Sequence, residues 1–214
     1  GYGLNIDLIE RAYQDGIDTI VTCDNGIAAA DEIAYGKSLG MTVIVTDHHE
    51  VPYEEVEGTR SYRLPPADAV VDPKQQGCAY PFSGLCGAAV AYQLVRVLCG
   101  EMGRDSKILD YLLENAAIAT VGDVMDLEDE NRIIVKEGLR RISSTQNLGL
   151  RALMECTKLE KDRIRAYHIG FILGPCMNAS GRLDTAKRAL DLLRTKSKKE
   201  ADVLAGDLKA LNDS

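Results

Sequence analysis

The hydrophobic positions in the first third of the chain alternate between two periods. Apolar residues at helical spacing run through residues 5–15 and 27–39, and a glycine follows each of these segments. Three short apolar runs, rich in β-branched residues, cover residues 19–23, 42–46 and 67–71. Continuous apolar strands that alternate with helices are typical of a parallel sheet with helices on both faces. The first third is therefore predicted to have an α/β fold.

From residue 83 onward the apolar residues recur at helical spacing, which predicts an all-helical region. The predicted helices cover residues 87–98, 106–119, 132–142, 148–156, 162–171, 184–193 and 196–211. The segment 50–66 carries three prolines and several acidic residues, so it is predicted to be an irregular surface loop. We expect an α/β part at 1–82, a helical part of the same domain at 83–195, and the start of a helical linker at 196–214.

Composition says little about the fold, but it limits the compartment in which the protein is expected to work. The chain has 214 residues, of which 45% are hydrophobic, and this supports a packed core. No apolar run approaches the roughly 18 to 20 residues that a membrane span needs, and the first residues lack a secretion signal pattern. The six cysteines include no Cys-x-x-Cys pair, so they are expected to be reduced and structural. We expect a cytoplasmic protein without a membrane partner.

The net charge of −8 argues against a protein that binds nucleic acid electrostatically over its whole surface. The argument is weakened because carboxylates that hold divalent cations count as negative charge until the metal binds. Basic residues gather in the helical region, where either contact with a nucleic-acid strand or ordinary solvation would explain them. They are Arg140, Arg141, Arg151, Lys158, Lys161, Arg163 and Arg165, with a denser group at Lys196, Lys198 and Lys199.

An aspartate follows each of the three predicted strands. Asp24, Asp47 and Asp72 occupy these positions, and each alone would be typical of a turn. Ligands of open parallel sheets bind outside the carboxyl ends of the strands. Asp47 is followed directly by His48 and His49, so oxygen and nitrogen ligands meet at one strand end. This set suits manganese or magnesium better than a structural zinc.

The histidines are unevenly distributed along the chain. Only three are present, and two of them form the His48-His49 pair. A solvated loop is the ordinary explanation of such a pair, but its place at a strand end favours contact with a metal or a phosphate. The third, His168, lies on an apolar helical face and is predicted to be structural.

Several segments of the chain resemble one known superfamily. Asp47-His48-His49 resembles the signature that names the DHH phosphoesterases, and residues 22–27 (TCDNGI) resemble the acidic motif before it. Residues 119–124 (ATVGDV) are similar to a later motif whose aspartate joins the metal site from a helical segment. The chain is identified as a member of the RecJ-like exonucleases within this superfamily by further segments, which are residues 1–5, 71–74, 80–82, 85–87, 174–175 and 178–183.

This resemblance implies hydrolysis of single-stranded DNA from its 5′ end, in DNA repair and recombination. Two Mn²⁺ or Mg²⁺ ions would activate water and stabilise the developing charge. Asp24 would bridge the ions, His48 and Asp123 would complete the shell of one of them, and His49 would face the scissile phosphate. Asp47 would orient a histidine by accepting its ring proton. Single-strand-binding protein and a helicase are the implied protein partners.

The resemblance also implies a phosphate clamp near residue 180. Arg182 offers paired donors that match phosphate oxygens, although a surface arginine at a helix start would look the same. Asn178 would help to hold this phosphate, and Gly181 would permit close approach of the backbone. Gly84 and Gly87 are interpreted as glycines that serve helix entry and packing.

Two expected parts of such an enzyme have no counterpart in the sequence. An aspartate-rich first motif is not found before the first strand, and the DHHA1-type domain that would close the cleft is not found after residue 214. We therefore expect an incomplete core that binds metal poorly and is inactive or nearly so.

Two other functions stay open on the sequence alone. The first is a superfamily enzyme that acts on short oligonucleotides, cyclic dinucleotides or pyrophosphate. The second is a non-catalytic repair scaffold, which the intact cluster of acids disfavours because clustered charges are costly to keep.

Overall fold

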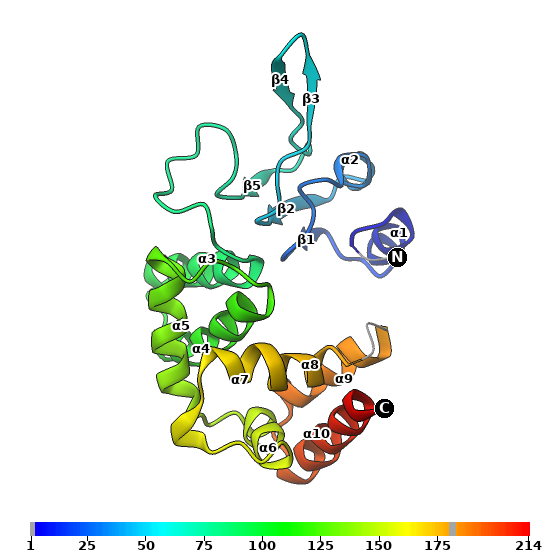
Figure 1. Ribbon diagram of the computed structural model, residues 1–214. Helices are drawn as coiled ribbons and strands as arrows, with labels where there is room; N and C mark the ends of the chain where they lie inside the picture. The colour runs from blue at the N-terminus through cyan, green and yellow to red at the C-terminus, as the bar shows by residue number, and fades with distance from the viewer. Residues whose placement is uncertain (1–2, 180–182) are drawn as a thin grey trace. The chain divides into compact units, whose positions relative to one another are not determined.

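The chain folds into two compact units, Gly1–Leu98 and Cys99–Ser214. The computed structural model describes residues 3–179 and 183–214 (Figure 1). The first unit contains the sheet and the second is helical, so the predicted order of an α/β region followed by a helical region is confirmed.

The sheet of the first unit has three parallel strands in the order β1-β2-β5 (Figure 1). They are β1 (Thr19–Val21), β2 (Thr42–Thr46) and β5 (Ala69–Val71). Two helices, α1 (Ile6–Gln14) and α2 (Ala30–Ser38), alternate with the first two strands. The three predicted strands therefore exist, in the predicted parallel arrangement.

The buried core of this unit lies where α2 packs on β2. Val43 and Val45, at 1% and 0% exposure, form one cluster with Ile33 of α2. Their β-branched side chains suit a central strand whose two neighbours are both paired. The core therefore fixes the central strand, whose carboxyl end carries Asp47.

The expected irregular loop at 50–66 is wrong, because this segment contains a β-hairpin. Strands β3 (Tyr53–Val56) and β4 (Thr59–Tyr62) pair in an antiparallel register. The two residues between them, Glu57 and Gly58, have φ of 52° and 77°, as a tight two-residue hairpin turn requires. Every residue of both strands is exposed, so the hairpin adds nothing to the core.

A large apolar cluster forms part of the core of the helical unit. The main helices of this unit are α4 (Lys107–Gly122), α5 (Asp129–Ile142), α6 (Leu148–Cys156), α9 (Leu183–Arg194) and α10 (Lys198–Asp213), and they follow α3 (Gly87–Glu101) along the chain. Leu153, Ile169, Leu192 and Leu208 are fully buried in the cluster. In the part of the chain that the structure describes, no helix combines the length and the apolar character needed to cross a membrane.

The single helix predicted at 162–171 is wrong, because the segment is divided into short pieces. A 3₁₀ turn, η1 (Lys161–Arg163), is followed by α7 (Ala166–His168), the π-helical turn η2 (Ile169–Leu173) and α8 (Gly174–Met177). Pro175, in the first turn of α8, has no N–H to continue an α-helical ladder. The wider π turn keeps the chain helical, since the N–H of Gly174 bonds the carbonyl of Ile169.

Candidate metal centre

The carboxyl ends of neighbouring strands bring two predicted aspartates to one edge of the sheet. The N–H of Asp24 donates to the carbonyl of Thr46 (3.0 Å), and the N–H of Asp47 donates to the carbonyl of Val71 (3.1 Å). Both aspartates therefore lie just beyond the parallel ladder, at the edge where open α/β sheets bind their ligands.

Asp24, His48 and His49 form a compact cluster at this edge. Each offers a ligand atom, and these atoms all lie within 4.8 Å of one another. Nε2 of His48 is 3.0 Å from Oδ1 of Asp24. His48 is buried, with 6% exposure, while the side chains of Asp24 and His49 are exposed. One carboxylate and two imidazoles make a donor set that fits a divalent cation such as Mn²⁺.

Asp47 lies next to this cluster. Its carboxylate contacts the backbone N–H groups of His48 and His49 and the ring of His49. Its carboxylate, at 1% exposure, accepts the N–H of Ile27 (2.9 Å) and the N–H of His48 (2.8 Å). Nδ1 of the His49 ring is 2.6 Å from Oδ1 of Asp47. A carboxylate in this position fixes the tautomer, so that Nε2 of His49 is the nitrogen left for a ligand. Asp47 thus contacts the His49 ring from outside the cluster, and its role in orienting that ring stays a prediction.

The hydrogen bonds around Asp47 determine its charge state. Burial is the largest single influence and acts to raise the pKa of Asp47. The hydrogen bonds from the Ile27 N–H, from the His49 ring and from the N–H groups of His48 and His49 outweigh it together, and the pKa is lowered below 3.8. Asp47 is therefore an anion at neutral pH.

The approach of helix α3 to Asp24 depends on a glycine. Asp24 has φ of 62°, in the left-handed region, and this turn directs its carboxylate toward the start of α3. A Cβ added at Gly87, the first residue of α3, would lie 2.3 Å from Oδ1 of Asp24. The sequence suggested only packing for Gly87, and nothing in its spacing indicated that it touches a candidate ligand.

The cluster opens into a cavity of about 390 Å³. Asp24, Asn25, Gly26, Asp47 and His49 are among the residues that line it. A cavity of this size admits a phosphate group together with part of a nucleoside. The candidate ligands are therefore accessible from one side and supported by the sheet on the other.

Asp72, the third strand-end aspartate, is not a member of this cluster. It is 2% exposed, and its Oδ1 accepts the N–H of Lys74 (2.8 Å). Its Oδ2 is buried and has no hydrogen-bond partner among the described residues. Burial raises the pKa of Asp72, and the charge of Asp47 raises it further.

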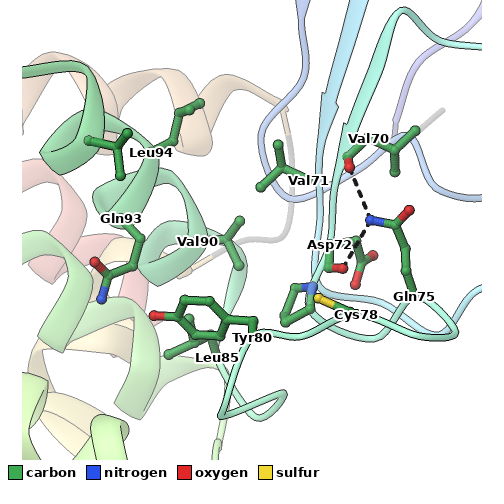
Figure 2. Close-up of a pocket in the computed structure, with 12 residues that line it drawn as sticks. Val70, Val71, Asp72, Gln75, Cys78, Tyr80, Leu85, Val90, Gln93 and Leu94 are labelled. Carbon is green, nitrogen blue, oxygen red and sulfur yellow. Dashed lines mark hydrogen bonds between the residues drawn. The ribbon is translucent and has the colours of Figure 1, made fainter. Parts of the chain in front are cut away.

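A second cavity, of about 350 Å³, lies beside β5 and the first turns of α3 (Figure 2). Val71 of the strand faces Val90 of the helix across it, and Leu94, Tyr80 and Leu85 complete much of its apolar wall (Figure 2). The walls offer few groups that could act on a phosphodiester. The candidate chemistry therefore belongs to the Asp24 cluster.

The remaining predicted site residues belong to the helical unit. Asp123 is the exposed residue that ends α4, and Val124 after it has φ of 56°, a strained value for a β-branched residue. Asn178 is exposed at the end of α8. Gly181 and Arg182 lie outside the described residues. The roles of all four stay predictions.

His168 has a local structural contact. Its Nδ1 accepts the N–H of Arg165 (3.0 Å), which caps the start of α7. This contact agrees with the structural role that the sequence suggested for this histidine.

Known proteins similar to this chain match it along its whole length and are RecJ exonucleases. The single-stranded-DNA-specific exonuclease RecJ of Bacillus subtilis is 40% identical over 99% of this chain and 25% of its own length. The Escherichia coli protein of the same name is 37% identical over 100% of this chain and 37% of its own length. The chain thus spans between a quarter and two fifths of the length of these relatives.

Solved structures agree in fold as well as in sequence. RecJ of Thermus thermophilus in complex with Mn²⁺ matches 98% of this chain and 30% of its own chain, with a TM-score of 0.79 and 30% identity. An exonuclease RecJ bound to manganese matches 100% of this chain and 51% of its own, with a TM-score of 0.82 and 31% identity. Residues 4–120 match the DHH family, N-terminal domain. This match covers more than half of the chain and includes the Asp24, His48 and His49 cluster, so the chain belongs to the DHH family.

Proposed function

We propose that this chain supplies the metal-dependent catalytic centre of an exonuclease that hydrolyses single-stranded DNA from the 5′ end. The observation that carries the proposal is the cluster of Asp24, His48 and His49 at the carboxyl edge of the sheet. The similarity to exonucleases named for single-stranded DNA, and to RecJ structures bound to Mn²⁺, supports the substrate and the metal.

Each residue of the metal cluster has a proposed role. Asp24 and His48 would hold the metal, with Asp123 of the helical unit as a further ligand, and bound Mn²⁺ or Mg²⁺ would supply an activated water and charge stabilisation. His49 would face the phosphate through Nε2, since its Nδ1 lies against Asp47. Asp47 keeps that ring in one orientation.

The substrate phosphate is assigned to a second group of residues. Arg182 would hold it through paired N–H donors, Asn178 would add a hydrogen bond, and Gly181 would let the backbone approach. Each of the six cysteines is a free thiol, which suits the reducing cytoplasm, where we place the reaction. Single-strand-binding protein and a helicase are the partners that we propose for it.

The test compares a histidine of the metal cluster with a histidine that caps a helix. In a protein that carries this chain at the full length of its relatives, we expect His48→Ala to lower Mn²⁺ affinity, and with it the Mn²⁺-dependent release of nucleotides from a long 5′-labelled single strand, by about 100-fold or more. His168→Ala, which removes a histidine from a helix start, should change neither by more than about twofold. Mn²⁺ binding is measured by calorimetry and digestion by gel.

Two results would contradict the proposal. Equal digestion by the His48→Ala variant and the parent would remove the metal cluster from the reaction. Cleavage of dinucleotides with no digestion of the long strand would assign the centre to a phosphodiesterase of short substrates.

A further inference from the structure

The turn between α5 and α6 forms a small polar pocket in the helical unit. Its volume is about 250 Å³. None of its lining residues is acidic, and two of them are cations. They are Ser143, Ser144, Thr145, Gln146, Arg151 and Lys161.

The two cations of this pocket differ from other basic residues of the same unit. Arg140 bonds Glu137, Arg141 lies 3.0 Å from Asp110, and Arg163 lies 3.0 Å from Glu160. Arg151 and Lys161, in contrast, have no carboxylate partner within the described part of the chain. Both are half-buried, so they are partly removed from the water that would otherwise solvate two like charges.

Two of the pocket hydroxyls bond carbonyls at the end of the preceding helix. Ser143 donates to the carbonyl of Arg140 (2.8 Å), and Ser144 donates to the carbonyl of Arg141 (3.3 Å). These carbonyls belong to the last turn of α5, where helix termini leave acceptors unpaired. Each of these carbonyl oxygens therefore has a hydroxyl donor.

Arg151 reaches the pocket from the first turn of α6. Asn147 caps this helix by accepting the N–H of Leu150 (3.0 Å), and the first turn carries the positive end of the helix dipole. A buried acid, Glu114, accepts the hydroxyl of Thr145, and burial raises the pKa of this carboxyl. The charged side chains that line the pocket itself are those of Arg151 and Lys161.

We propose that this pocket binds a phosphate group of the nucleic-acid backbone. The inference rests on the proposed function for the choice of nucleic acid as the source of the phosphate. Arg151 offers paired donors and Lys161 a mobile point charge, the two ways in which proteins hold phosphate oxygens. Because the chain carries a net charge of −8, affinity for a strand depends on local sites of this kind.

The test is the salt dependence of binding to a fluorescent oligothymidylate, measured by anisotropy with EDTA present. We expect the Arg151→Ala/Lys161→Ala variant to bind on the order of tenfold more weakly at low salt. The slope of log affinity against log salt should fall by about 1.4, since each contact with a single strand contributes about 0.7. The matched control is Arg132→Ala/Lys136→Ala, which removes the same charges from exposed positions on α5 and should leave the slope unchanged.

Three results would overturn the inference. One is an unchanged slope in the pocket variant, and another is an equal loss in the control variant. The third is saturation of the pocket by inorganic phosphate with no effect on oligonucleotide binding, which would mark a site for free anions. Because these measurements use no divalent metal, they are independent of whether the Asp24 cluster cleaves DNA.

Discussion

The α/β unit surrounds a buried anion with donors, whereas the helical unit keeps two cations together without an acid. Asp47 is held by backbone N–H groups and an imidazole. Arg151 and Lys161 share a pocket in which no acidic side chain lines the wall. The first arrangement holds an imidazole beside the candidate metal ligands, and the second is suited to a phosphate. The comparison teaches that the overall charge of a chain says little about what each of its regions binds.

The two units also use close-packed glycines for different purposes. Gly87 lies against the carboxylate of Asp24, a side chain of the candidate centre. Gly149 lies against the main chain, since an added Cβ would be 1.9 Å from the carbonyl oxygen of Leu192. An added methyl group should therefore disturb metal binding in one unit and folding in the other.

The largest expected effect is that of Gly149→Ala. The main chain at Leu192 cannot move as a side-chain end does, so we expect a loss of about 3 kcal/mol in the free energy of unfolding. Gly206→Ala, on α10 with open space around it, should raise this free energy by about 1 kcal/mol. Urea denaturation followed by circular dichroism measures both. Equal stability of the two variants would show that α6 and the end of α9 are not in contact.

An intermediate effect is expected for Gly87→Ala. The methyl group would displace Asp24, so we expect Mn²⁺ affinity to fall by about 10-fold to 100-fold with little change in the melting temperature. Gly100→Ala, in the same helix with nothing within 4 Å, is the matched control and should bind Mn²⁺ as the parent does. Calorimetric titration measures the affinity. Unchanged binding by both variants would show that Asp24 is not a ligand.

The smallest expected effect concerns Asp72. Its pKa in the folded chain is raised above 3.8, so the folded state binds this proton more tightly than the unfolded state does. The resulting destabilisation is absent below pH 3.8 and grows as pH rises through the folded pKa. Asp72→Asn should therefore be more stable than the parent by about 1 kcal/mol at pH 7 and equal to it in acid. Urea midpoints across this range measure the difference, and a constant difference would exclude the titration of Asp72 as its cause.

The sequence predicted regular elements well where one force dominated. The apolar run at 42–46 is strand β2, and the helical spacing at 148–156 is helix α6, with the same bounds as in the structure. The hairpin was missed because its strands are exposed, so no apolar alternation marks them. The break at 162–171 was missed because Ile164 and Arg165 take extended backbone angles, with ψ of 129° and 167°, and no glycine or proline marks this position in the sequence.

The site was predictable to the extent that topology determines it. Strand ends in a parallel sheet converge, and this alone brings Asp24 close to His48 and His49. The sequence did not reveal that Asp72 is buried and is not a member of the cluster, because a strand-end position does not specify a side-chain direction. The contact of Gly87 with Asp24 depends on the path of the chain between β5 and α3, which no local pattern encodes.

The hairpin of β3 and β4 has a consequence for how this domain tolerates change. Because its strands bury nothing, its loss should leave the sheet intact, and its amides should exchange with solvent deuterium long before those of β2. A foreign peptide inserted at its tip, between Glu57 and Gly58, should leave the fold of the domain unchanged. Evolution is similarly free to lengthen, shorten or recruit this ribbon for a new contact while the metal ligands stay in place.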